Sequence, residues 1–246
     1  MRERYGIDAP RVVAVLGGLG LLCAVGALLA GPLLGDVLGE VPGAALAGFL
    51  GLWAVLLCVQ AGWSVLGSLL GKRREWRRLL DGLNLVGDER VLEIGPGTGP
   101  VLVEAARRVP FGRVVGVDLW RPGDQAGNSR AALLANAAAA GVAGRVEVVD
   151  GDMRALPFPA GVFDVALASL AVHNLPDADR SGAIREVVRV LRPGGRLVIL
   201  DFQATEEYER TLRAAGAVAV TRSGRHWTMH PPVRVVTAAV PARAAS

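Results

Sequence analysis

Three acidic residues stand at the ends of three successive apolar segments of the chain. Glu93 lies near the end of the first, in "VLEIGPGTGP", Asp118 ends the second, in "VVGVDLW", and Asp152 follows the third, in "VVDGDM". In an open parallel sheet, ligands bind outside the carboxyl ends of the strands. If the three segments are neighbouring parallel strands, their carboxylates line one ligand site.

The glycines after the first segment predict a cofactor other than a dinucleotide. A dinucleotide fingerprint reads G-x-G-x-x-G and receives a pyrophosphate on its backbone amides and on a helix N-terminus. Here the glycines run G-x-G-x-G from Gly95 to Gly99, and Pro100 holds the sixth position. Glu93 beside this turn would repel a pyrophosphate and attract a cationic ligand.

The positions of the acids match the parts of S-adenosylmethionine. At the end of a strand, Asp118 is suited to accept hydrogen bonds from both hydroxyls of a ribose, which fits NAD and S-adenosylmethionine equally. Asp152 is suited to accept from an adenine amine, while Met153 offers its backbone amide. With Glu93 at an ammonium, the three acids describe a ligand with an ammonium, a ribose and an adenine in sequence, which is S-adenosylmethionine.

The wider order of elements predicts an α/β fold. From residue 73 onward, Val-, Ile- and Leu-rich runs alternate with helical stretches, which is typical of a doubly wound, mainly parallel sheet. The expected strands are 90–94, 113–119, 145–149, 163–170 and 196–202, and the expected helices are 98–109, 129–140 and 177–191, the last ending at the stop signal "RPGG". A charged helix over 205–214 then precedes "AVAVTRSG" and "PVRVVTAAVPA", which predict an antiparallel hairpin.

Longer stretches of the sequence resemble a known family. "VLEIGPGTG", "VVGVDLW", "GDMRALPFPAGVFDVALASLAVHNL" and "RVLRPGGRLVILDF" are similar, in order, to the motifs of class I S-adenosylmethionine-dependent methyltransferases, over about residues 76–242. The stretch "DLWRPGDQAGNSR" further resembles a little-characterised bacterial group of them. The resemblance implies a Rossmann-like sheet of seven strands whose last strands form the antiparallel hairpin.

The resemblance also implies a set of cofactor-binding residues. Those for the methionine part are Glu93, Gly95, Pro96, Gly97 and Gly99; those for the ribose and adenine are Asp118, Leu119, Trp120, Asp152 and Met153; Ser169 and Leu170 would line the pocket floor. For Trp120, packing beneath a helix is an equally open interpretation. Asn128 and Ser129 are expected to cap a helix, without a ligand role.

One residue is a candidate for acid–base chemistry. Methyl transfer from a sulfonium is an in-line displacement, so alignment of the acceptor can supply most of the rate. A general base is needed only if the acceptor arrives protonated. His173, in "SLAVHNL", is the one candidate that the motifs bring to the transferable methyl, either as a base or as a residue of the pocket wall.

Several residue types are informative by their absence. Both cysteines, Cys23 and Cys58, precede residue 72, which argues against arsenic chemistry on thiolates. An N-P-P-Y or D-P-P-Y signature is absent after the fourth strand, which disfavours amino groups of bases or glutamine as acceptors. His226 and His230 have the spacing of a zinc pair but no third ligand nearby, so no metal is expected.

The N-terminal third of the chain predicts a membrane hairpin. Residues 12–34 and 44–70 contain no charged side chain, and each exceeds the roughly 20 residues that cross a bilayer core. A cleaved signal peptide has a shorter apolar core, yet whether the first span is retained stays open. Arg2, Arg4 and Arg11 precede the first span and "KRREWRR" follows the second, so the positive-inside rule predicts a cytoplasmic domain over 72–246.

The predicted membrane also explains the positive charge of the chain. The net charge is +4 and the pI is near 9.8. The densest basic run abuts the predicted membrane, where anionic lipid headgroups attract it. Nucleic acid is therefore not expected as a partner. Small residues recur at four-residue spacing within the spans, so packing of the hairpin on itself and homodimerisation both stay open.

These features predict a membrane-anchored methyltransferase of the inner cell membrane that acts on a small-molecule or lipid-like acceptor. Two alternatives remain. One is a non-catalytic S-adenosylmethionine-binding module of a membrane complex. The other is a different enzyme on the same fold. Glu93 and Pro100 disfavour an NAD-dependent oxidoreductase, and the lack of an acid-rich polyamine site disfavours an aminopropyl transferase. The identity of the acceptor is not readable from the residues.

Overall fold

The computed structural model describes residues 3–38, 40–121 and 125–242. Arg2 and the segment 122–124 of "DLWRPGDQAGNSR", both used above, lie outside the described residues. So does Gly39, between the two predicted spans. All other predicted elements can be compared with the structure.

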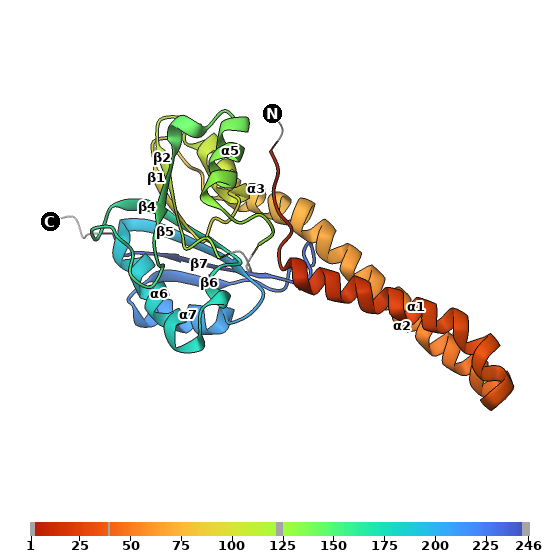
Figure 1. Cartoon of the computed structure of the whole chain (residues 1–246). Coiled ribbons are helices and arrows are strands. Elements are labelled where there is room, and N and C mark those ends of the chain that lie inside the picture. Colours follow the sequence, from red (N-terminus) through yellow and green to blue (C-terminus); the bar gives the residue numbers. More distant parts are fainter. Residues whose placement is uncertain (1–2, 39, 122–124, 243–246) are drawn as a thin grey trace.

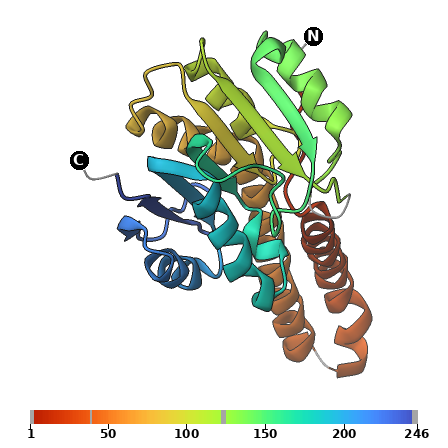
Figure 2. The ribbon, with the colours of Figure 1, turned by 90° about the vertical axis from the view of Figure 1, so that its left-hand side faces the viewer.

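A seven-stranded sheet forms the centre of the C-terminal domain, with the strand order β3-β2-β1-β4-β5-β7-β6. The strands are β1 (Arg90–Ile94), β2 (Arg113–Asp118), β3 (Val146–Asp150), β4 (Phe163–Ser169), β5 (Leu191–Asp201), β6 (Val218–Arg222) and β7 (Arg234–Ala239). The first five strands are parallel, and β7 is antiparallel to both β5 and β6. The predicted fold class, with its C-terminal antiparallel hairpin, is confirmed (Figures 1 and 2).

Helices cover both faces of the sheet because successive strand residues point to opposite sides. Val91 belongs to the core beneath α3 (Lys72–Gly82), α4 (Pro100–Arg108) and α5 (Arg130–Ala139), whereas Leu92 belongs to the core beneath α6 (Asp177–Val190) and α7 (Thr205–Ala214). This two-sided burial explains the near-continuous apolar runs of the strands.

The predicted start of the fifth strand is wrong. The helix α6 ends at Val190, next to the "RPGG" stop signal, but β5 begins at Leu191 and not at Arg196. Leu191 pairs with Phe163, and the register then shifts before Arg196 pairs with Val165. The glycine-containing stretch is thus a bulge inside the strand, since a bulge absorbs extra residues without ending the pairing.

Two long helices, α1 (Pro10–Leu38) and α2 (Glu40–Leu66), project from one end of the domain as an antiparallel pair (Figure 1). Both are long and apolar enough to cross a membrane, and their leucines and valines are largely exposed, as at Leu28 and Val55. One π-helical turn (Gly67–Gly71) joins α2 to α3. The helix α1 extends a few residues beyond both ends of the predicted span 12–34. The helix α2 begins before residue 44, the predicted start of the second span.

The residues before α1 run along the domain beside α5 (Figure 1). We call residues 3–9 the N-terminal segment. The backbone of Arg4 exchanges two hydrogen bonds with the side chain of Asn136, at 2.7 and 2.8 Å, and the carbonyl of Ile7 accepts from the amide of Ala126 at 3.2 Å. The start of the apolar hairpin is therefore attached to the loop and helix that follow β2.

Candidate active site

The turn between β1 and α4 depends on its glycines. Gly95 and Gly97 adopt positive φ angles of 65° and 56°. A Cβ atom at Gly95 would lie 2.5 Å from Cβ of Ala171, and one at Gly97 would lie 2.4 Å from Oε1 of Gln125. Gly99 also has a positive φ and precedes α4 as its N-cap. These positions admit only glycine without strain or displacement.

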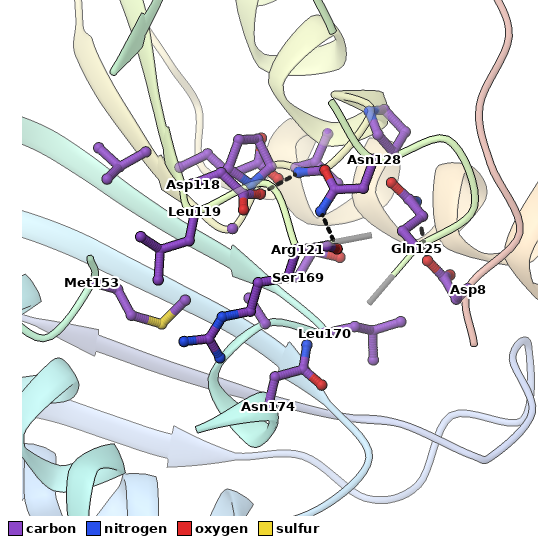
Figure 3. A pocket seen from close by; sticks show the side chains of 18 of the residues that line it. Asp8, Asp118, Leu119, Arg121, Gln125, Asn128, Met153, Ser169, Leu170 and Asn174 are labelled. Atoms are coloured by element: carbon purple, nitrogen blue, oxygen red, sulfur yellow. Dashed lines mark hydrogen bonds between the residues drawn. The ribbon is translucent and has the colours of Figure 1, made fainter. Parts of the chain in front are cut away.

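A cavity lies in front of this turn, at the carboxyl ends of β1, β2 and β4 (Figure 3). Most of the residues predicted to bind the cofactor line it: Glu93, Gly95, Pro96, Gly97, Asp118, Leu119, Asp152, Met153, Ser169 and Leu170. The carboxylate of Asp118 accepts from the amide of Gly97 at 3.0 Å and so fixes the turn to the end of β2. The hydroxyl of Ser169 accepts from the indole of Trp76 at 2.8 Å.

Two predicted residues are not in the cavity wall. Gly99 packs toward Leu133 of α5, where an added Cβ would lie 2.9 Å from the leucine side chain. The indole of Trp120 donates to Asp150 at 2.6 Å, and its backbone amide donates to Asp118 at 2.8 Å. Trp120 thus contacts the end of β3, and its predicted contact with adenine stays a prediction.

Asp152 and Ser129, both named from the sequence, accept hydrogen bonds from residues close to them in the chain. The carboxylate of Asp152 accepts from Arg154 at 2.6 Å, and this hydrogen bond lowers the pKa of Asp152. Ser129 caps α5 as predicted, accepting from the amide of Ala132 at 3.1 Å. Its neighbour Asn128, expected only as a capping residue, lines the cavity instead and donates to the carbonyl of Arg121 at 3.0 Å.

Glu93 is a buried acid of the cavity with a raised pKa. Its side chain is buried, with 1% of the residue exposed, and Oε2 has no hydrogen-bond partner among the described residues. Burial raises the pKa of Glu93 to about 8, opposed by the nearby Lys72 ammonium and assisted by the charge of Asp118. A buried acid without a full set of partners is costly, and a cationic ligand would supply the missing charge.

Sequence reasoning missed several residues of the cavity wall. Asp8, Lys72, Gln125 and Asn174 all line it, and Figure 3 shows the side chains of Asp8 and Gln125 next to each other. Asp8 and Lys72 were visible in the sequence only as charges flanking the apolar spans. Nothing in their spacing indicated that the chain brings them to the glycine turn.

A second cavity of about 350 Å³ adjoins the first and lies against the base of the long helices. Asp8, Leu170 and Asn174 line both cavities. The other residues of the second cavity come from α1, from the end of α2 and its π turn, from the ends of β4 and β5, and from the loop before β7: Ala9, Val12, Val13, Leu16, Ser64, Ser68, His173, Phe202, Met229, His230, Pro231 and Val233. Its wall is mainly apolar.

His173, the predicted catalytic candidate, lies in the wall of the second cavity next to a buried acid. Its Nδ1 atom is 2.8 Å from Oδ1 of Asp201, although the direction between them misses that of a hydrogen bond. Asp201 is fully buried at the end of β5 and accepts from the hydroxyl of Tyr208 at 3.2 Å and the amide of Phe202 at 2.8 Å.

Hydrogen bonds fix the position of Asp201. Burial and the neighbouring carboxylate raise the pKa of Tyr208, which therefore stays protonated and donates to Asp201. The ring of Phe202 lies 4.5 Å from the ring of His173 and limits its motion. An imidazole whose Nδ1 faces a carboxylate presents Nε2 on its other side, which is the arrangement of an oriented base.

The remaining two histidines have separate surroundings. His226 contacts Glu75 through Nδ1 at 2.6 Å. His230 contacts Ser64 at 3.0 Å and Gln60 at 3.2 Å, both on α2. Within the part of the chain that the structure describes, neither joins a group of three metal-binding side chains.

Residues 92–199 match the family model described as a methyltransferase domain. The chain contains a class I S-adenosylmethionine-dependent methyltransferase domain. The matched span begins in β1, includes the glycine turn and Asp118, and ends in β5. The predicted family resemblance and the predicted cofactor, S-adenosylmethionine, are thereby confirmed.

Individual relatives agree with this assignment. The ubiquinone/menaquinone biosynthesis C-methyltransferase UbiE of Pseudomonas entomophila is 37% identical over 148 residues, which are 58% of this chain and 55% of that protein. The chain thus spans about half the length of the curated relatives it matches. An S-adenosylmethionine-dependent methyltransferase of Aquifex aeolicus matches with a TM-score of 0.55 and 20% identity, over 68% of this chain and 89% of that one.

The fold alone does not fix the chemistry. The [4+2]-cyclase SpnF matches with a TM-score of 0.56 and 22% identity, over 68% of this chain and 82% of that one. At such identities the likeness shows the fold only, and folds host unrelated activities. The chemistry depends on the residues of the site.

The residues of the first cavity fit S-adenosylmethionine. Oε2 of Glu93 has no partner among the described residues, and the ammonium of the cofactor would supply one. The glycine turn leaves free the space that Cβ atoms would fill. Asp118 already accepts two backbone amides, and each carboxylate oxygen retains a second acceptor site for a ribose hydroxyl. When bound, the cofactor supplies a methyl group that its positive sulfur has already activated.

The titration of Glu93 predicts a pH dependence of cofactor binding. A carboxyl with a pKa of about 8 is neutral below that pH and ionised above it, and the ionised form holds a cation more tightly. We expect the Kd for S-adenosylhomocysteine to fall as the pH rises toward about 8, by up to about tenfold per pH unit. Above about pH 8 the Kd should level off. Calorimetric titration over this range checks the slope. Glu93→Gln should remove it, and a sloping profile in this variant would assign the titration to another group.

Proposed function

We propose that the protein is a membrane-anchored methyltransferase that transfers a methyl group from S-adenosylmethionine to a lipid-like acceptor entering from the bilayer. The observation that carries this proposal is the second cavity. Val12, Val13 and Leu16 of α1 form part of its wall, while Leu170 and Asn174 connect it to the cofactor cavity. An apolar molecule that leaves the bilayer along α1 would meet the reacting centre without crossing water.

The two long helices support an anchoring role. Their exposed apolar side chains would be solvated by lipid. The arginines of α3 follow the end of α2 and lie next to Leu69 and Leu70. We infer a hairpin over residues 1–71 with the methyltransferase domain on the cytoplasmic side of the inner membrane. Since Gln60 and Ser64 contact the loop before β7, the membrane-embedded part of α2 would end near Val59. Residues 40–59 span about 30 Å as a helix, which suits a bilayer core.

The relatives narrow the class of acceptor. UbiE of Pseudomonas entomophila is named for C-methylation in the biosynthesis of ubiquinone and menaquinone. A prenylated quinol has an apolar tail and a polar ring with ionisable hydroxyls. The tail suits the wall of the second cavity, and the ring suits its polar end at His173 and Asn174. We therefore propose a quinol-like lipid as the acceptor.

His173 would act as the general base. With Nδ1 next to Asp201, Nε2 of the imidazole would accept the proton that the acceptor loses. The acceptor forms its new bond to the methyl carbon, the bond from sulfur to that carbon breaks, and its electron pair stays on sulfur. The products are the methylated acceptor, S-adenosylhomocysteine and a proton that His173 returns to water.

A cavity-filling variant tests the acceptor site separately from the cofactor site. Leu16→Trp places a larger side chain in the wall of the second cavity, and we expect it to raise KM for the lipid acceptor by about tenfold or more. The Kd for S-adenosylhomocysteine should stay unchanged. Steady-state assays in nanodiscs and calorimetry measure the two quantities.

The matched control is Val15→Trp, which lies one residue away and faces outward, with 59% of Val15 exposed. It should leave KM unchanged. If both variants behave like the wild type, the acceptor does not use this cavity, and the proposed entry along α1 is wrong.

A further inference from the structure

An ion pair in the wall of the cofactor cavity joins the two ends of the apolar hairpin. Asp8 lies two residues before α1, and Lys72 is the first residue of α3. Nζ of Lys72 is 2.6 Å from Oδ1 of Asp8, and only 5% of Lys72 is exposed. Gln125 donates to the same oxygen at 3.1 Å, and Ser68 accepts from the amide of Asp8 at 3.2 Å. These contacts fix the pair at the cavity wall.

In the part of the chain that the structure describes, two carboxylate oxygens on residues that line the same cavity lack a partner. Oδ2 of Asp8 and Oε2 of Glu93 are buried, and neither has a hydrogen-bond partner among the described residues. The ammonium of Lys72 has three donors, and among the described residues it donates a hydrogen bond to Asp8 alone. Unpaired buried polar atoms cost free energy. The set therefore offers acceptors for a cation and donors for an anion at one place.

We infer that Asp8 and Lys72 form the subsite for the amino-acid end of S-adenosylmethionine. Lys72 donates to the carboxylate of that end, while Asp8, together with Glu93, accepts from its ammonium. The charges of Lys72, the ligand carboxylate, the ligand ammonium and Asp8 then alternate in sign, and Glu93 adds a second negative charge beside the ammonium. This inference rests on the proposed function, because it assigns residues to the cofactor of that reaction.

The assignment gives the N-terminal segment a role in binding. Asp8 is attached through Ile7 to the loop after β2 and continues directly into α1. It also lines the acceptor cavity, so it lies between the two ligands. The cofactor site would be complete only when the base of the membrane anchor is seated on the domain.

The test compares two ligands that differ only in the amino-acid end. Calorimetry on the full-length protein in nanodiscs measures the Kd of S-adenosylhomocysteine and of 5′-methylthioadenosine, which lacks both the carboxylate and the ammonium. We expect Lys72→Met and Asp8→Asn each to weaken S-adenosylhomocysteine by about ten- to a hundredfold, the range of a charged hydrogen bond. The affinity for 5′-methylthioadenosine should not change. Arg74→Met and Asp88→Asn, at exposed positions, are the controls.

Three results would overturn the inference. Unchanged binding of S-adenosylhomocysteine in both variants would remove the subsite. Tighter binding in Asp8→Asn would mean that Asp8 competes with the ligand carboxylate for Lys72. Equal losses for both ligands would mean that the pair maintains the shape of the cavity and contacts no amino-acid end. A wild-type protein that binds neither S-adenosyl ligand would instead overturn the proposed function itself.

Discussion

Replacement of His173 by glutamine is expected to lower kcat by about a hundred- to ten-thousandfold, the usual contribution of a general base. Glutamine keeps a polar side chain beside Asp201 but cannot take a proton from the acceptor. The Kd for S-adenosylhomocysteine should stay unchanged, because His173 lines the acceptor cavity and not the cofactor cavity. Single-turnover assays in nanodiscs, combined with calorimetry, measure both quantities.

Asp201 provides the companion test, since it acts through His173 and is a positioning residue. Asp201→Asn should lower kcat because an amide no longer favours the Nδ1-protonated tautomer of His173. The loss should shrink as the pH rises toward the pKa of the acceptor, where the acceptor ionises without help. A merely structural role would give a loss that does not depend on pH. If His173→Gln keeps the full kcat, His173 is a residue of the pocket wall and no base.

The second large effect is expected at Asp118. Its carboxylate fixes the glycine turn through the amide of Gly97 and lies where a ribose would be held. Asp118→Ala should weaken S-adenosylmethionine and S-adenosylhomocysteine by about a hundredfold, since it removes hydrogen bonds to a charged group and leaves a buried amide unpaired. The double variant with Glu93→Ala should abolish detectable binding. Calorimetric titration with both ligands and with NAD measures this.

The matched control for Asp118 is Asp150→Ala. Asp150 ends the neighbouring strand β3 and contacts Trp120 and Arg130, but it does not line the cavity. Its removal should leave the affinity for both S-adenosyl ligands unchanged. Binding of NAD by the wild type, or equal losses in the two variants, would contradict the reading of the cavity.

The fold was predictable because its strands are buried on both faces and each acid lies at or near the end of a strand. The strands from β1 to β4 lie within one residue of their expected bounds, and the hairpin of β6 and β7 is where the sequence indicated. Asp201 could have been found by the same rule, since it ends the fifth strand in "VILDF". The bulge in β5 could not, because "RPGG" indicates a helix stop equally well before a loop and before a bulge.

The parts of the site that sequence reasoning missed depend on contacts between distant residues. Asp8 and Lys72 are 64 positions apart and meet only because α1 and α2 fold back on each other. Trp120 follows Asp118 closely, yet its positive φ of 55° and its hydrogen bond to Asp150 are consistent with its position outside the cavity wall. Local spacing predicts which residues follow a strand, but not which way a side chain turns after it.

The measurement that tests the central claim most directly is the fate of a tritium-labelled methyl group. The full-length protein in nanodiscs is incubated with labelled S-adenosylmethionine and a total lipid extract of bacterial membranes, and the label is followed by solvent extraction. We predict label in the organic phase, on a lipid that chromatography assigns to the quinol fraction, and none with the Glu93→Ala, Asp118→Ala variant. Label transferred only to water-soluble acceptors, or no transfer despite tight cofactor binding, would contradict the account.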